Sequence, residues 1–391
     1  MKNYFRKMSL VLIMVFALSS IGDAQKRSVK SVKKIADTQT KSTVVSDKRD
    51  TLEMVFVLDT TGSMGGLIDG AKQRIWGIIN EVMQKQSRPR VRVGLVAYRD
   101  LGDEYVTKIT PITEDLDLVY TNLMAYRADG GGDEPENVRK ALAEGVKKAG
   151  WSEVKAGLAQ IVFLVGDAPP QNYVQEPDVL ATTAEAVRKN MIVNTIQCGA
   201  LSGTKEIWQN IALRGEGRYF AIAQDGGVQA ISTPYDAKLA ELAGKIGKTY
   251  TTYGSLSVQG RNFARQSAAE VTITADAPVA AQAERAVNKA VNSFSYDGDL
   301  VQDVENEIVK MEDVKDENLP VELKKLSPAE RKKEIEKRIE ERKSIRAEIL
   351  TLSKKRDEYL AAERKKTNKQ QGFDAAVAQA LKEQLLKKGI K

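Results

Sequence analysis

The residues best suited to chemistry are three oxygen-bearing side chains in the stretch Asp59-Thr60-Thr61-Gly62-Ser63. The stretch follows the apolar run Met54–Leu58, which has the composition of a buried strand. Alternate residues of an extended loop can point the same way, so Asp59, Thr61 and Ser63 can converge. A carboxylate and two hydroxyls suit a hard divalent cation such as Mg²⁺, Ca²⁺ or Mn²⁺, and they do not suit zinc or copper.

Two other loops carry carboxylates that could complete the shell of such an ion, which takes about six oxygens or more. Asp167 closely follows the apolar run 161–165, so we expect it at the same edge of a sheet as Asp59. The loop Gly130-Gly131-Gly132-Asp133 can approach a ligand closely, because glycine has no side chain to obstruct it. We therefore predict one metal site with ligands from three loops, namely Asp59, Thr61, Ser63, Asp133 and Asp167.

Each of these loops also has a purely structural explanation. The first could cap the helix that follows it, Asp133 could cap a helix starting at Pro135, and Asp167 could be a turn residue before two prolines. Asp100 and Asp103 also follow a strand, and we expect them in a solvated loop rather than around the site.

Six short apolar runs alternate with amphipathic stretches from about residue 52. The expected strands are 54–58, 91–98, 105–109, 159–165, 191–198 and 217–222, and the expected helices between them are 67–84, 135–148, 179–189 and 205–213. Strands that are apolar on both faces and separated by helices predict a largely parallel sheet covered on both sides. The strand 105–109 follows its predecessor through a short loop, which favours an antiparallel edge strand. The predicted fold is therefore a doubly wound α/β sheet of six strands, with ligands expected beyond the carboxyl ends of the strands.

The combination of Asp59-x-Thr61-x-Ser63 with Asp133 and Asp167 resembles the von Willebrand factor type A domain and its metal-ion-dependent adhesion site. The resemblance covers about residues 52–250 and implies one divalent cation, usually Mg²⁺, on the upper face of the sheet. It implies that Asp59 acts through water, that Thr61 and Ser63 coordinate directly, and that Asp167 lies in or just outside the shell. The position of Asp133 is a threonine in the integrin version of the family. An added carboxylate should hold the ion more firmly and attract an acidic ligand less.

The 391 residues divide into five predicted segments. They are a signal peptide (1–24), a disordered linker (25–51), the main domain (52–250), a mixed extension (251–326) and a charged helical region (327–391). A basic start and the short apolar run Leu10–Leu18 indicate a bacterial protein exported to the periplasm or beyond, with an uncleaved anchor as the alternative. No later run is long enough to predict a membrane span. The single cysteine, Cys198, lies in an expected core strand and is predicted to be buried and inert.

The last third of the chain is predicted to be mainly helical. Helices are expected over 235–248 and 278–293, with a strand-like, irregular segment over 249–275. Ser327-Pro328-Ala329-Glu330 is a capping box that should start a long helix ending at about Lys366. Ile345, Ile349, Leu352 and Tyr359 fall on a heptad seam, but Arg342 and Arg356 interrupt it, so the coiled-coil signal is weak.

The chain has no histidine, and no acidic pair is clearly placed as a general base, so we predict that it is not an enzyme. The predicted function is that of a secreted or periplasmic binding protein that uses its cation to engage a protein or cell-surface ligand, with an acidic ligand group as one way to complete the metal shell. An envelope scaffold acting through the C-terminal helix is the alternative, and a metal-dependent hydrolase has less support. No aromatic stacking pattern or groove-reading motif indicates nucleic-acid binding. The sequence leaves the oligomeric state open.

Overall fold

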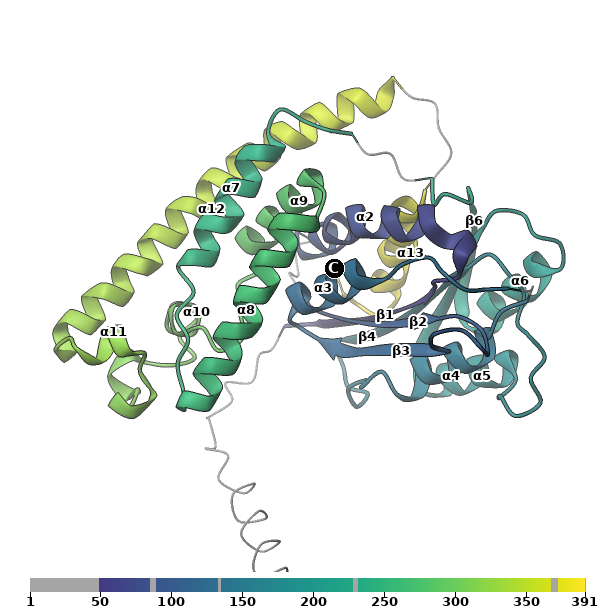
Figure 1. Ribbon diagram of the computed structural model, residues 1–391, viewed down its shortest axis with the longest axis horizontal. Helices are drawn as coiled ribbons and strands as arrows, with labels where there is room; N and C mark the ends of the chain where they lie inside the picture. The colour runs from purple at the N-terminus through teal and green to yellow at the C-terminus, as the bar shows by residue number, and fades with distance from the viewer. Residues whose placement is uncertain (1–48, 85–88, 133–134, 228–230, 367–371, 391) are drawn as a thin grey trace, which may run out of the picture. The chain divides into compact units, whose positions relative to one another are not determined.

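The computed structural model describes residues 49–84, 89–132, 135–227, 231–366 and 372–390. The predicted signal peptide and most of the predicted linker lie outside these residues. Six strands form one sheet in the order β3-β2-β1-β4-β5-β6, and only β3 is antiparallel to its neighbour (Figure 1). The strands are β1 (Thr51–Asp59), β2 (Arg90–Tyr98), β3 (Thr107–Thr113), β4 (Leu158–Gly166), β5 (Met191–Cys198) and β6 (Glu216–Ile222). The predicted doubly wound α/β class is confirmed.

Helices cover both faces of this sheet, because its central strands are buried along their whole length. On one face, α2 (Gly65–Met83) and α3 (Leu116–Ala125) contribute to the larger hydrophobic core. On the other face, the core includes α4 (Val138–Lys147), α5 (Val179–Arg188) and α6 (Thr204–Arg214). Cys198 is buried at the end of β5, as predicted. Helix α3 was not predicted; Asp115 caps it by accepting a hydrogen bond from the backbone N–H of Leu118.

The segment predicted as strand-like over 249–275 is instead largely helical, and that prediction was wrong. It contains α8 (Leu256–Asp276), an unbroken helix of 21 residues. The β-branched run Val271-Thr272-Ile273-Thr274 favours a strand locally. Packing overrides that preference, since Ile273 and Ala269 are buried against the larger core of the sheet.

The helical extension is held to itself by buried arginines. It contains α7 (Asp236–Lys248), α9 (Val279–Val291), α10 (Leu300–Glu305), α11 (Val321–Lys324) and α12 (Pro328–Lys365), and α12 packs along α7 and α9 (Figure 1). The predicted capping box at Ser327 is confirmed. Arg342 and Arg356, which interrupt the heptad seam, are 0% and 2% exposed. They are therefore anchors of the helix and not defects in its packing.

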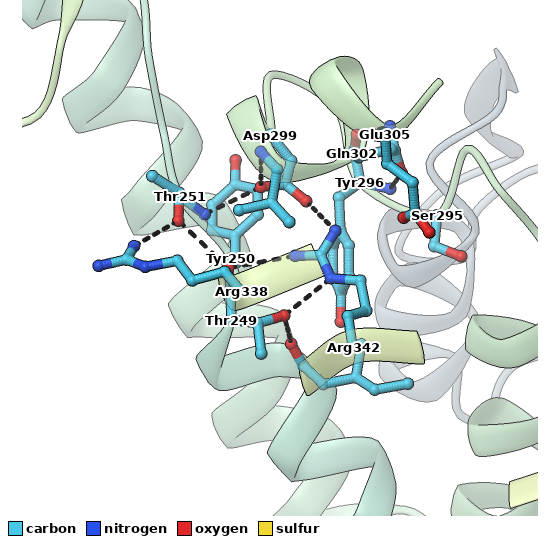
Figure 2. A network of polar contacts seen from close by, with 12 residues as sticks. Thr249, Tyr250, Thr251, Ser295, Tyr296, Asp299, Gln302, Glu305, Arg338 and Arg342 are labelled. Atoms are coloured by element: carbon cyan, nitrogen blue, oxygen red, sulfur yellow. Dashed lines mark hydrogen bonds and ion pairs between the residues drawn. The ribbon is translucent and has the colours of Figure 1, made fainter. Parts of the chain in front are cut away.

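Figure 2 shows how Arg342 joins α12 to the segments before α8 and α10. Its guanidinium donates to Asp299 Oδ2 at 2.6 Å, and to the side-chain and backbone oxygens of Thr249 at 2.9 and 3.1 Å. Asp299 Oδ1 in turn accepts from the backbone N–H of Thr251 at 3.0 Å. Both charged side chains are fully buried, and the ion pair between them neutralises both charges, with Arg342 as the hydrogen-bond donor and Asp299 as the acceptor.

The last helix, α13 (Phe373–Lys387), returns to the sheet, which the sequence analysis did not anticipate. It packs against α2, β5 and β6, and Phe373 lies 6.0 Å from Phe56 between ring centroids. Asn194 and Gln384 exchange two hydrogen bonds of 3.0 and 2.6 Å in the buried interface. Residues near the end of the chain thus complete the core of a sheet that begins at Thr51.

Candidate metal centre

The loop that carries Asp59 and the loop that carries Asp167 emerge side by side from the middle of the sheet. Asp59 is the last residue of β1, and Asp167 follows the last residue of β4. The two strands are parallel neighbours, and the strand order reverses between them. In doubly wound sheets this point leaves a crevice at the carboxyl ends, where ligands bind.

Hydrogen bonds gather the oxygens of the first loop. The backbone N–H and the hydroxyl of Thr61 both donate to Asp59 Oδ1, at 2.9 and 2.6 Å. The Thr61 hydroxyl also lies 3.5 Å from the hydroxyl of Ser63. The three side chains therefore lie close together, although Ser63 is part of a short 3-10 helix (Gly62–Met64) and not of the extended loop that we predicted. The helix-cap explanation fails here, because neither Thr61 nor Met64, the two residues at the helix starts, makes a side-chain capping bond.

Asp167 is tied to the first loop by Gln224, which follows β6. The side-chain amide of Gln224 donates to Asp167 Oδ2 at 2.6 Å and reaches the backbone oxygen of Ser63 at 3.3 Å. Gly166 lets the start of the Asp167 loop lie close to Asp59. A Cβ at residue 166 would lie 3.1 Å from Asp59 Oδ2 and 2.4 Å from the Tyr98 hydroxyl. Nothing in the sequence pattern pointed to Gln224.

Asp133 lies outside the described residues, but its loop is placed on both sides of it. The backbone N–H of Gly62 donates to the carbonyl of Gly130 at 3.1 Å. Gly131 has a φ of 71°, and a Cβ there would come within 2.8 Å of Thr61 Cβ. The glycine run therefore lets this loop lie directly on the first one. The following helix, α4, is capped by Asn137.

The carboxylate of Asp59 is buried. No cationic side chain is among the described groups that bond to it. Its Oδ1 is bound by Thr61, whereas its Oδ2 has no hydrogen-bond partner within the described part of the chain. Burial raises the pKa of Asp59 to about 7, and the neighbouring negative charge of Asp167 adds to the rise. An acid in this position is poorly stabilised as an anion until a positive charge lies beside it.

Glu136 is a further acid at this site, and the sequence analysis did not single it out. Its side chain is buried, and its Oε2 has no hydrogen-bond partner in the portion described. Burial raises its pKa to about 8, with further contributions from Asp59, Asp100 and other acids. The backbone N–H of Glu136 donates to the carbonyl of Pro169 and its carbonyl accepts from the N–H of Gln171, so the segment before α4 is held against the loop after β4. The run Asp133-Glu134-Pro135-Glu136 was the available signal for it.

We predicted a solvated loop for Asp100, and that prediction is wrong. It is 3% exposed, and its Oδ2 accepts a 2.7 Å hydrogen bond from the hydroxyl of Tyr173. Its Oδ1 has no partner in the residues described. Asp103 instead has a structural role, since its carboxylate accepts from the backbone N–H groups of Asp100 and Gly131.

These residues fit a hard cation by their chemistry. Asp59, Asp100 and Glu136 each have one buried oxygen without a partner, and each is a carboxylate. Across the described ranges, no three carboxylate, imidazole or thiol side chains form a metal-binding group by themselves. A cation here would therefore depend on the hydroxyls of Thr61 and Ser63 as much as on the acids, which is typical of Mg²⁺ rather than of softer metals.

Comparison with known proteins agrees with this geometry. Residues 53–234 match the family model of the von Willebrand factor A domain. The chain contains a von Willebrand factor A domain. Such domains commonly mediate protein interactions.

Curated relatives match over the same type of domain. The chain is 29% identical to von Willebrand factor A domain-containing protein 7 of Mus musculus over 194 residues, and 28% identical to the Homo sapiens protein over 194 residues. Each match covers 50% of this chain and 20% of the relative, so the alignments span about a fifth of those proteins.

Solved structures give weaker similarities. The conserved hypothetical protein BatB from Bacteroides thetaiotaomicron is 16% identical with a TM-score of 0.33, covering 44% of this chain and 90% of that one. An aerotolerance-related membrane protein from Bacteroides fragilis is 15% identical with a TM-score of 0.31, covering 45% and 92%. In the part of this chain that the structure describes, no helix is long and apolar enough to span a bilayer.

Proposed function

We propose that this protein binds a protein or surface ligand through one divalent cation held by its von Willebrand factor A domain. The residues proposed to hold the ion are Asp59, Thr61, Ser63 and Asp167, joined by Asp133 from the glycine loop. One observation carries the proposal. Asp59 is buried beside Asp167, with one oxygen bound by Thr61 and the other without a partner among the described residues.

The protein's own residues would prepare the site in two ways. Hydrogen bonds from Thr61 to Asp59 Oδ1 keep the threonine hydroxyl oriented with its lone pairs free. Gln224 holds Asp167 against the first loop, which limits the freedom that an ion would otherwise have to remove. When bound, the cation supplies a positive charge that can accept one oxygen from a ligand. We expect Mg²⁺, with Ca²⁺ and Mn²⁺ able to substitute, because every proposed ligand atom is an oxygen.

We propose binding rather than catalysis because the von Willebrand factor A domain that residues 53–234 match commonly mediates protein interactions. The chain has no histidine. The predicted export of the protein would place the site where it meets other proteins or surface glycans.

Titration calorimetry with MgCl₂ tests the metal part of the proposal. We expect the wild-type protein to bind one Mg²⁺ and Asp59→Ala to bind none that is measurable. Asp69→Ala is the matched control, because Asp69 is an exposed acid on the helix that follows the motif. Equal Mg²⁺ affinity in the wild type and Asp59→Ala would contradict the assignment.

The binding part is tested by ligand capture in Mg²⁺ against EDTA. We expect an immobilised wild-type protein to retain a specific ligand in Mg²⁺ and to release it in EDTA, whereas immobilised Asp59→Ala retains none. A ligand held equally by both proteins in EDTA would show that the surface used lies elsewhere.

A further inference from the structure

The backbone of Glu136 is held directly against the loop that carries Asp167. Its N–H donates to the carbonyl of Pro169 at 3.2 Å, and its carbonyl accepts from the N–H of Gln171 at 2.7 Å. The same carbonyl accepts from the N–H of Val138, the first residue of α4, at 2.8 Å. The position of Glu136 is therefore fixed between the loop after β4 and the start of α4.

The side chain of Glu136 reaches towards the loop that carries Asp59. A Cβ added at Gly131 would lie 2.8 Å from Glu136 Oε1 and 2.8 Å from Thr61 Cβ. The carboxylate and the threonine side chain therefore lie against the same point, which glycine leaves open because it has no side chain. Thr61 is also the residue whose hydroxyl binds Asp59 Oδ1. The negative charges of Asp59 and Asp167 add to the rise in the pKa of Glu136 that burial causes, so the three acids lie near one another.

The carboxylate of Glu136 is not fully satisfied by the residues that the structure describes. Its Oε2 is buried and has no hydrogen-bond partner among them. Glu53, a buried glutamate near the opposite end of β1, shows the contrast. Its carboxylate accepts hydrogen bonds from Arg92, Ser152 and Gln160. A buried carboxylate without such partners is costly, so the free oxygen of Glu136 marks a place for a cation.

We propose that Glu136 is a further ligand of the divalent cation and binds it with the carboxylate oxygen that lacks a partner. The inference rests on the proposed function, because it adds one residue to the same metal centre. No three acids in the described ranges form a metal-binding group by themselves, so Glu136 acts together with the hydroxyls of Thr61 and Ser63. Since the backbone of Glu136 is already fixed on both sides, little freedom is lost when its carboxylate binds the ion.

Titration calorimetry with MgCl₂ tests the assignment on Glu136→Gln, which keeps the shape of the side chain and removes its charge. We expect the affinity for Mg²⁺ to fall about 100-fold, the upper end of the effect of residues that only orient a metal ligand. Glu53→Gln is the matched control and should bind Mg²⁺ as the wild type does. If Asp59→Ala loses Mg²⁺ while Glu136→Gln keeps the wild-type affinity, this inference is overturned and the proposed metal centre stands. If Asp59→Ala also keeps that affinity, both are overturned.

Thermal unfolding in EDTA at about pH 8 separates a metal ligand from a residue that only supports the fold. We expect Glu136→Gln to melt at or above the temperature of the wild type, because the amide removes a negative charge that faces other acids. Glu53→Gln should melt at a lower temperature, because it weakens the ion pair with Arg92. A metal-free Glu136→Gln that melts clearly below the wild type would show that Glu136 acts through the fold and would overturn the proposal.

Europium luminescence tests direct contact between Glu136 and the ion. With the protein in excess of Eu³⁺, the lifetimes in H₂O and D₂O together give the number of water molecules bound to the ion. We expect Glu136→Ala to hold more bound water than the wild type, because water takes the place of the lost carboxylate. Glu53→Gln should match the wild type. Equal hydration of the ion in Glu136→Ala and the wild type would show that Glu136 does not touch it and would overturn the proposal.

Discussion

The acids at the edge of the sheet and the acids of the helical extension are buried to a similar degree, but they are treated in opposite ways. In the extension, Asp299 is bound by Arg342, and Asp236 is bound by Arg356 at 2.7 Å. At the sheet edge, Asp59 and Glu136 have neighbouring acids and each has an oxygen without a partner. The extension neutralises its own charges, whereas the sheet edge is arranged for a charge from outside.

This contrast follows from the cost of burying ions. A buried carboxylate loses its hydration, and it regains that free energy only when a cation with good geometry lies beside it. The arginines of α12 meet this need within the fold. For Asp59 in the von Willebrand factor A domain, we propose that bound Mg²⁺ supplies the cation. The two regions should therefore respond differently to mutation, metal and pH.

The largest expected effect is the loss of an internal partner. Arg342→Met should destabilise the protein by about 3–5 kcal/mol, because it leaves Asp299 buried and unpaired. Urea unfolding measures this change. Lys245→Met, which removes an exposed pair on α7, is the control and should leave the stability close to that of the wild type. The double variant Arg342→Met, Asp299→Asn should recover part of the loss. A similar loss of stability in Arg342→Met and Lys245→Met would remove the distinction between buried and surface pairs.

Mg²⁺ should stabilise the sheet edge and leave the extension unaffected. At one hundred times the dissociation constant, a ligand that binds only the folded state adds about 2.7 kcal/mol. We expect this gain in the wild type and in Arg342→Met, and we expect none in Asp59→Asn. Thermal unfolding in MgCl₂ and in EDTA gives the measurement. A gain that survives in Asp59→Asn would place the ion somewhere else.

The stability of the metal-free protein should fall as pH rises. The pKa of Asp59 is raised from 3.8 to about 7, and that of Glu136 from 4.5 to about 8. At pH values between the unfolded and the folded pKa of each acid, the folded protein holds more protons than the unfolded chain. The contribution of the two acids to stability is therefore fully present at low pH and is lost as pH rises to about 7 to 8. Each group contributes a slope of up to about 1.4 kcal/mol per pH unit.

Unfolding in EDTA at a series of pH values between about 5 and 8.5 measures that slope. Asp59→Asn should reduce it, because the amide does not titrate. Saturating Mg²⁺ should also reduce it, because the ion favours the ionised carboxylates. A stability that rises over this range in EDTA would contradict the assignment of raised pKa values to the site.

The smallest expected effect is that of Gln224, which touches Asp167 but is not a proposed ligand. Gln224→Ala should weaken Mg²⁺ binding about tenfold, since groups that orient a metal ligand typically contribute 10- to 100-fold. Calorimetry measures the affinity, and urea unfolding in EDTA should show a stability close to that of the wild type. An unchanged affinity would mean that Asp167 needs no support from Gln224.

Much of the fold could be predicted because its signals are local. The central strands β1, β4 and β5 are short apolar runs, and the capping box at Ser327 marks the start of its own helix. The closeness of Asp59, Thr61 and Ser63 follows from their positions within one five-residue stretch of the chain. Such features need no knowledge of distant contacts.

The features that escaped prediction depend on distant partners. Arg342 and Arg356 read as defects in a heptad seam because Asp299 and Asp236 lie far away in the sequence. Gln224 reaches Asp167 across 57 positions. The helix α8 was hidden by its β-branched residues, whose local preference is overridden by packing. Glu136 belongs to a loop that only the folded chain brings to Asp59.

Anomalous diffraction from crystals of this protein grown with Mn²⁺ tests the central claim most directly. The account predicts one strong peak among the oxygens of Asp59, Thr61, Ser63 and Asp167, and its disappearance in Asp59→Ala. A strong peak elsewhere, or none at this edge of the sheet with Mn²⁺ in large excess, would contradict it.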